Sequence, residues 1–125
     1  FVFKHYPLRM HDWARPAAAA AECAGAQGKF WEYHHALYER QSEWSNEKAD
    51  ELFQKYAAEL KLDAKSWDAY RKAPAANATL DGDIKDGDGA LVRATPTFFV
   101  NGRRFVGAKQ LAELAPLHID KELKK

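Results

Sequence analysis

The sequence contains a single cysteine, Cys23, among its 125 residues. One cysteine cannot form a disulfide bond within its own chain, so a fold held together by several disulfides is excluded. The cysteine count alone leaves open whether the protein works in an oxidising or a reducing compartment.

The sequence also lacks an excess of charge and a long apolar run. Nineteen Lys and Arg residues balance eighteen Asp and Glu residues, for a formal net charge of +1. No basic stripe stands out, so we expect neither nucleic acid nor an anionic membrane surface as a partner. No apolar run approaches the length of a membrane-spanning helix. The hydrophobic fraction of 46% instead predicts a packed globular core.

The first eight residues lack the features of a signal peptide, which are a basic start, a longer apolar stretch and a small-residue cleavage site. Residues 1–6 mix aromatic and β-branched side chains and end at Pro7, which predicts a core strand. The sequence has no initiator Met and opens inside this predicted strand. We therefore expect it to be a piece of a longer polypeptide.

The middle of the sequence predicts helices. The alanine run at residues 17–21 favours a helix, with Asp12 as its N-cap and Pro16 in its first turn. Apolar residues at spacings of three and four predict two more helices, at about 29–41 and from about 45 to 60. A short fourth helix should begin after Asp63 and stop before Pro74.

The pattern changes after residue 74. Three glycines at 82, 87 and 89 predict a frayed helix or a loop over residues 75–92. Residues 97–100 read as a strand, and Asn101-Gly102 predicts a tight hairpin to a returning strand at 103–107. A last helix should cover about 109–123, kinked or divided at Pro116. This order predicts an α/β arrangement with a helical insertion in a single domain, residues 1–125.

Thr95-Pro96 is the segment best suited to binding. Proline cannot donate to a sheet ladder, and it pushes the residue before it toward extended geometry. The backbone N–H and C=O of Thr95 would then be free to pair with an extended peptide. The local sequence alone favours a simpler interpretation, a trans proline at the entry of a strand.

Three ordered stretches resemble the DsbA-like thioredoxin-fold thiol:disulfide oxidoreductases. They are Ala94-Thr95-Pro96-Thr97-Phe98-Phe99-Val100-Asn101-Gly102, Phe1-Val2-Phe3-Lys4-His5-Tyr6-Pro7-Leu8, and residues 17–31 with Glu22-Cys23-Ala24 and Gln27-Gly28-Lys29-Phe30-Trp31. The resemblance implies a thioredoxin-like fold that is truncated at its N-terminus. Thioredoxin-fold elements would lie at residues 1–8 and 92–125, with the helical insertion at about 13–75.

By this resemblance Pro96 would be cis and Thr95 would present its backbone to substrate. The redox-active Cys-x-x-Cys is expected upstream of Phe1, so this chain would hold no catalytic residue and no cofactor. The implied partners are extended segments of proteins with thiols or disulfides, and a membrane redox partner of the parent protein. The implied location is extracytoplasmic, in the periplasm or cell envelope. Because a central strand would be missing, we also expect either a homodimer or a cover over the open edge from the missing segment.

Other candidate residues carry weaker signals. Lys4 could tune a nearby cysteine pKa, although a solvated strand end explains it as well. Cys23 could act as a nucleophile, but a small buried apolar residue is the better interpretation. The five histidines show no metal-ligand spacing. Residues 81–89 fail the calcium-loop pattern at three positions and predict a polar turn.

Two departures from the family pattern and two other functions remain open. The glycine-rich segment before Thr95 is usually a well-formed helix in the family. A second cysteine near Trp67, found in some members, is missing, so we predict no structural disulfide. The alternatives are a peptide-binding module without redox chemistry and a relative of the kappa-type glutathione transferases and isomerases.

Overall fold

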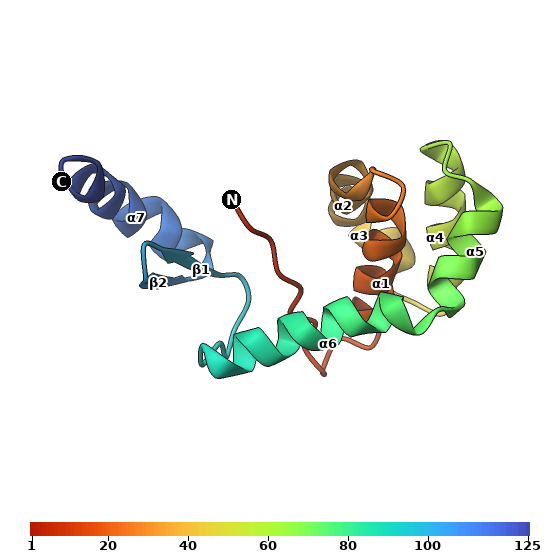
Figure 1. The fold of residues 1–125 in the computed structure, drawn as a ribbon, viewed down its shortest axis with the longest axis horizontal. Helices are drawn as coiled ribbons and strands as arrows, with labels where there is room; N and C mark the ends of the chain where they lie inside the picture. The colour runs from red at the N-terminus through yellow and green to blue at the C-terminus, as the bar shows by residue number, and fades with distance from the viewer. The chain divides into compact units, whose positions relative to one another are not determined.

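The computed structural model describes residues 1–125 and contains seven helices and two strands (Figure 1). The chain divides into two compact units, residues 1–85 and 86–125. In chain order the elements are α1 (Ala14–Gly25), α2 (Phe30–Glu39), α3 (Gln41–Trp44), α4 (Ala49–Glu59), α5 (Ala64–Lys72), α6 (Pro74–Gly89), β1 (Thr97–Val100), β2 (Arg103–Val106) and α7 (Gly107–Leu123). The mixed α/β class predicted from the sequence is confirmed.

Helix α1 is the centre of the first unit. It contacts α2, α4 and α5, and its buried face consists of small side chains, namely Ala17, Ala20, Ala21, Cys23 and Ala24. Methyl groups let neighbouring helices approach closely, and alanine also has the highest helix propensity. The predicted Asp12 cap is wrong, because Trp13 occupies the N-cap position and no side chain caps the helix there.

Aromatic side chains from α2, α3, α4 and α5 fill the rest of this core. The buried members are Tyr33, Trp44, Phe53, Tyr56 and Trp67. The Tyr33 hydroxyl donates to the Phe53 carbonyl at 2.9 Å, and Trp44 Nε1 donates to the Leu37 carbonyl at 2.8 Å. The Tyr33 hydroxyl and the Trp44 indole N–H are therefore hydrogen-bonded although they are buried away from water.

The turn before α5 is fixed by two side chains. The Asp63 carboxylate accepts from the Ser66 N–H at 2.8 Å, which confirms the predicted N-cap. Gln27 bonds the backbone of Asp63 in both directions, with its Nε2 donating to the carbonyl and its Oε1 accepting from the N–H. The chain segment between α1 and α2 is thereby tied to the start of α5.

The predicted strand at residues 1–6 is wrong. These residues form no ladder, because the one sheet of the structure pairs β1 with β2. The ring of Phe3 packs edge-on against the rings of His5 and His34, whereas the side chain of Phe1 is fully exposed. Side-chain packing onto helices therefore holds this segment in place of strand pairing.

The predicted loop or frayed helix before residue 92 is also wrong, because α6 runs unbroken from Pro74 to Gly89. Burial of Ala76 and Leu80, with ion pairs at Asp81 and Asp83, offsets the cost of about 1 kcal/mol for a glycine inside a helix. The segment 81–89, expected to be a polar turn, lies inside this helix. The helix ends where Leu91 turns to a φ of +60°.

The second unit is a β-hairpin covered on one face by α7. Thr97 pairs with Val106 and Val100 with Arg103, in an antiparallel register. Asn101 (φ +46°) and Gly102 (φ +80°) both occupy the left-handed region, as a two-residue hairpin turn requires. This confirms the predicted hairpin.

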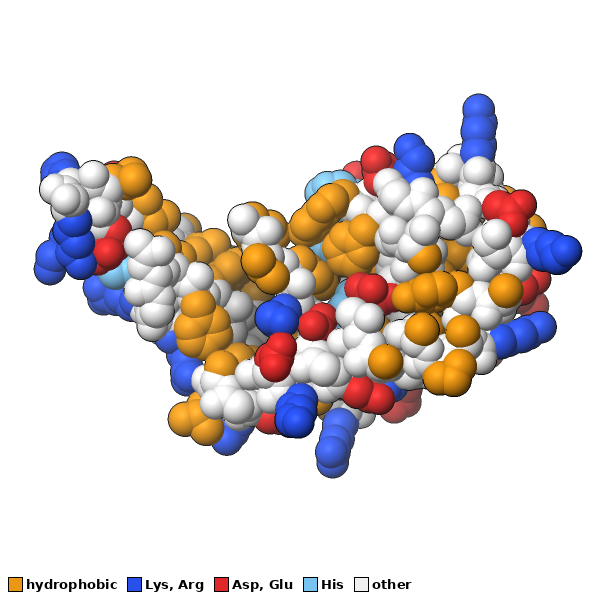
Figure 2. All heavy atoms as spheres, in the orientation of Figure 1, with side chains coloured by type: hydrophobic (Ala, Val, Ile, Leu, Met, Phe, Trp, Pro, Cys, Tyr) orange, Lys and Arg blue, Asp and Glu red, His pale blue; other side chains and the backbone are white.

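Helix α7 begins at Gly107 and continues past Pro116 to Leu123, so of the two predicted effects of Pro116 the division is wrong, and the kink stays a prediction. Ala115 of this helix and Phe105 of the hairpin are both buried. The ring centres of His118 and Phe105 lie 6.0 Å apart, and His118 Nε2 lies 2.9 Å from the Val100 carbonyl. Four other apolar side chains of α7 are exposed, namely Leu114, Leu117, Ile119 and Leu123. Hydrophobic side chains are visible on the surface over this helix in Figure 2.

Candidate functional site

The segment that leads into β1 has a fixed backbone. The Thr95–Pro96 peptide bond is cis, and both residues are exposed. The Pro96 carbonyl accepts from the Gly107 N–H at 2.8 Å, and Thr97 Oγ1 donates to the Ala94 carbonyl at 2.6 Å. Bonds on both sides of Thr95 therefore hold it in place.

The hydrogen-bond pattern shows which backbone groups face outward. In an antiparallel pair, every second residue points its N–H and C=O toward the partner strand. Because Gly107 bonds to Pro96, the next bonded pair is Phe98 with Phe105, and the N–H and C=O of Thr97 and Phe99 point away from β2. The backbone N–H and C=O of Thr95 have no partner in the structure. This free edge can accept an extended peptide.

One cationic side chain of the second unit lies close to a residue of β1. The Arg104 guanidinium lies 5.4 Å from the ring centre of Phe99 and donates to the carbonyls of Ala90 and Leu91 beyond the end of α6. It thereby satisfies carbonyls that the helix end leaves unpaired. Arg93 and Arg103 are exposed nearby in sequence.

Cys23 lies in the core of the first unit, fully buried and unpaired. Burial raises the pKa of its thiol to about 11, opposed by the positive charge of Arg71 and assisted by the negative charge of Glu22. A thiol with this pKa is protonated near neutral pH, and the thiolate is the reactive form. The structure places Cys23 where it packs as a small apolar residue.

Lys4 belongs to the first unit as well. Its side chain is half exposed, and its Nζ lies 3.6 Å from the Asp83 carboxylate on α6. The neighbouring His5 is buried, with its Nε2 2.8 Å from Glu22 and its backbone N–H bonded to Asp83. Lys4 and His5 thus attach the first residues of the chain to α1 and α6.

The histidines of α2 do not form a metal site. Desolvation lowers the pKa of His34, and the neighbouring His35 and His5 lower it further. Its buried Nδ1 has no hydrogen-bond partner. No group of three or more His, Cys, Asp or Glu side chains lies close enough to hold a metal ion.

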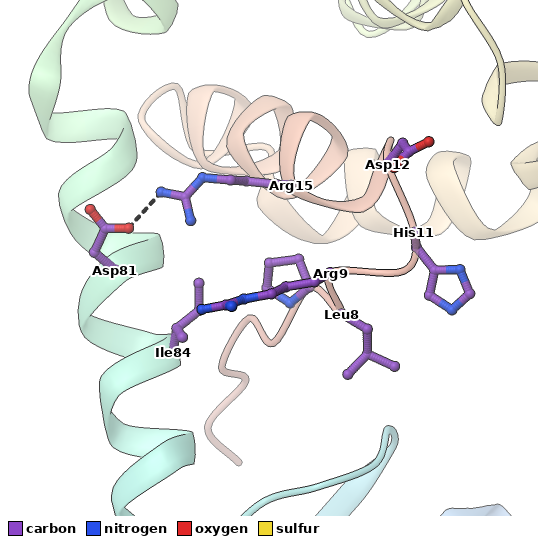
Figure 3. Close-up of a pocket in the computed structure, with 8 residues that line it drawn as sticks. Leu8, Arg9, His11, Asp12, Arg15, Asp81 and Ile84 are labelled. Atoms are coloured by element: carbon purple, nitrogen blue, oxygen red, sulfur yellow. Dashed lines mark hydrogen bonds and ion pairs between the residues drawn. The ribbon is translucent and has the colours of Figure 1, made fainter.

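Sequence reasoning missed a pocket in the first unit (Figure 3). The cavity has a volume of about 510 Å³ and is lined by Pro7, Leu8, Arg9, His11, Asp12, Arg15, Asp81 and Ile84. Arg15 Nη2 and Asp81 Oδ1 are 2.5 Å apart across it. The residues that line one wall lie about seventy positions from the other wall, so no local motif could reveal it.

Curated relatives match most of this chain. It is 39% identical over 116 residues to a protein named Na(+)/H(+) antiporter NhaA 1 from Salinispora arenicola, which covers 92% of this chain and 17% of that protein. It is 35% identical over 119 residues to a protein of the same name from Mycolicibacterium gilvum, covering 91% and 18%. A protein named Na(+)/H(+) antiporter NhaA from Nitrosospira multiformis gives 35% over 116 residues. The chain therefore spans less than a fifth of the length of these relatives.

No solved structure gives a significant match to the chain. None of its helices is both long enough and apolar enough to span a membrane. The family model described as thioredoxin matches residues 1–120, which is nearly the whole sequence. The helices and the small antiparallel sheet are thus those of a thioredoxin-like domain, a kind of domain that suggests a redox module. The chain belongs to the thioredoxin family.

Proposed function

We propose that this chain is the substrate-holding part of a DsbA-like thiol:disulfide oxidoreductase. The observation that carries the proposal is the backbone of Thr95, which is exposed, fixed by its neighbours and without a partner. An extended segment of a client protein would pair with it and continue along the free edge of β1.

The redox chemistry in this proposal belongs to a cysteine pair in another segment of the parent protein. A client thiolate would attack one sulfur of that disulfide and release the other sulfur as a thiolate. A second client thiolate would then attack the mixed disulfide. The client is oxidised by two electrons and the cysteine pair is reduced to its dithiol. This chain would hold the client segment in place during both attacks.

A second candidate function, binding without redox chemistry, is compatible with the burial of Cys23. Because the thiol pKa is about 11, the chain has no reactive thiolate of its own at neutral pH. The same free edge would then serve a binding module that holds extended polypeptide without redox chemistry.

The proposal extends to partners and location. Clients would be extended segments of proteins with thiols or disulfides, and a membrane redox partner would reoxidise the parent protein. Such chemistry belongs to an oxidising, extracytoplasmic compartment. The exposed apolar side chains of α7 also support a homodimer. Light scattering would test the dimer, and a monomer at all concentrations would contradict it.

The relatives named as antiporters share a module with this chain. The aligned stretch is 17–18% of each of these proteins, so the identity supports a common domain and not a shared transport activity. In our proposal, the domain serves within larger polypeptides.

Peptide binding is the direct test. A thiol-free, unfolded peptide should bind the purified protein, and fluorescence anisotropy would measure its affinity. Methylating one backbone nitrogen of the peptide, at the position that pairs with Thr95, should weaken binding at least about tenfold because it removes a donor. Equal binding of both peptides would exclude recognition through the edge of β1.

The redox arm needs the intact parent protein. Oxidation of a reduced client, lost after thiol alkylation, would support the oxidoreductase. Peptide binding that persists without any dithiol oxidation would favour the binding module. Failure of both assays would overturn both functions.

A further inference from the structure

The pocket of the first unit has two arginines on one side. The side chains of Arg9 and Arg15 both extend from the N-terminal part of the chain toward α6 (Figure 3). The Arg15 guanidinium is paired with Asp81, whereas the Arg9 guanidinium has no ion pair or hydrogen bond in the structure. Arg9 is an exposed residue of the pocket lining, and a guanidinium without a partner can donate several hydrogen bonds to a ligand.

The other charged groups of the pocket leave this position free. The Asp12 carboxylate lies at the start of α1 and is directed away from α6, and the His11 ring also points away from it (Figure 3). Asp81 is the acidic group that faces the arginines, and Arg15 already neutralises it. The lining thus holds two guanidiniums and two carboxylates, and of the two guanidiniums only that of Arg15 is paired with a carboxylate.

Helix α1 begins at the pocket, with the pocket residue Asp12 directly before its N-cap residue Trp13, so the Asp12 carboxylate offsets part of the positive potential there. The first turn of the helix contains no acidic residue, and no side chain caps it. Helix N-termini carry a partial positive charge that favours anions. The apolar wall of the pocket is formed by Pro7, Leu8 and Ile84, which can contact a short hydrocarbon group.

From this combination we propose that the pocket binds a small organic anion, with its carboxylate or phosphate group on Arg9 and Arg15 and its aliphatic part against Ile84. Planar guanidinium groups match the geometry of both oxyanions. The site lies within the first unit and does not depend on the peptide-binding edge of β1, so the two proposals stand or fall separately.

Titration of the purified protein with hexanoate and, separately, with inorganic phosphate tests the site. Nuclear magnetic resonance should show amide shifts confined to residues 7–15 and 81–84. Shifts with hexanoate alone would identify a carboxylate ligand with an aliphatic stem, and shifts with phosphate alone would identify a phosphate ligand. No saturable shift with either anion would overturn the proposal.

Two substitutions decide whether the arginines act as proposed. Arg9→Gln should weaken binding at least about tenfold, because hydrogen bonds to charged groups are among the stronger ones. Asp81→Asn should strengthen it, because Arg15 would lose its internal competitor. Arg93→Gln in the second unit is the matched control and should leave the affinity unchanged. Weaker binding in Asp81→Asn, or unchanged binding in Arg9→Gln, would contradict the proposal; thermal melts would show that each variant is folded.

Discussion

The two units of the chain differ in how many apolar side chains they bury. The first buries a continuous aromatic and aliphatic cluster in which Tyr33, Phe53 and Tyr56 have no exposed surface. The second buries only three apolar residues, Val92, Phe105 and Ala115, while Leu117 is 70% exposed and Leu123 80% exposed. Apolar burial is the main favourable term in folding, so the first unit has its own source of stability and the second has much less.

This difference shows where additional contacts are needed. A two-stranded hairpin is marginally stable alone and needs more strands or a packed helix. Helix α7 supplies one such layer on one face. The opposite face carries Thr97, Phe99, Arg104 and Val106, and Phe99 is 47% exposed. The second unit therefore has one covered face and one available face.

Truncation of the aromatic core should have the largest effect. Phe53→Ala is expected to lower the free energy of unfolding by about 3–5 kcal/mol, because it leaves a cavity among packed rings. Leu117→Ala, at an exposed position of α7, should change it by less than about 0.5 kcal/mol. Urea denaturation followed by circular dichroism would measure both. Similar losses in the two variants would remove the contrast between the units.

A pH titration of stability tests the burial of Cys23. Its thiol pKa rises from the ordinary 9.0 to about 11 in the folded chain, so the unfolded chain loses the proton first. Stability is complete below pH 9 and falls between pH 9 and 11, by about 2 kcal/mol across this interval. Cys23→Ala should remove that part of the slope. An unchanged slope in this variant would mean that other groups, such as Tyr56, account for the pH dependence.

A smaller effect is expected at the start of α5. Asp63→Ala removes the side chain that accepts from Ser66, and the melting temperature should fall by roughly 3–6 °C. These hydrogen bonds also lower the pKa of Asp63. The contribution of Asp63 is therefore present at neutral pH and lost as the pH falls through that lowered value. Asp68→Ala, on the surface of the same helix, is the control and should have little effect on the melting temperature.

The smallest effects on stability are expected at two glycines, one with helical backbone geometry and one with a positive φ. Gly82 lies in α6 with no atom within 4 Å of an added Cβ, so Gly82→Ala should stabilise the chain by about 0.5–1 kcal/mol. Gly102 has a φ of +80° in the hairpin turn, so Gly102→Ala should destabilise it by about 1 kcal/mol. Thermal denaturation of both variants would show the opposite signs, and a shared sign would contradict the assigned backbone geometries.

Local signals in the sequence predicted the elements whose causes are local. The Asp63 cap and the Asn101-Gly102 turn need only a few neighbouring residues, and both are confirmed. The unbroken helix α6 was not predicted because its glycines lower the helix propensity of the segment. Its two buried positions, Ala76 and Leu80, are too few to show the pattern of a buried helix face. Its support comes from distant residues, since Arg15 pairs with Asp81 and Lys4 with Asp83. The prediction of a strand at residues 1–6 was wrong because a strand needs a neighbouring strand to pair with. The local sequence cannot show whether such a neighbour is present.

The candidate site divides in the same way. The sequence singled out Thr95 and Pro96 because proline constrains its own neighbourhood. It could not show that the Gly107 N–H reaches Pro96, which decides the outward direction of Thr97 and Phe99. The pocket around Arg9 was also out of reach, since Ile84 and Asp81 lie on a helix far along the chain.

The alanines of α1 have a consequence for how this domain can vary. Ala20 and Ala24 have no exposed surface, and the helix touches three others. A larger side chain there would force helices apart, at a cost of typically about 1–3 kcal/mol. Replacement of a surface residue on α4 or α5 carries no such penalty. The helix that looks least distinctive in composition is thus the one where mutational tolerance should be lowest.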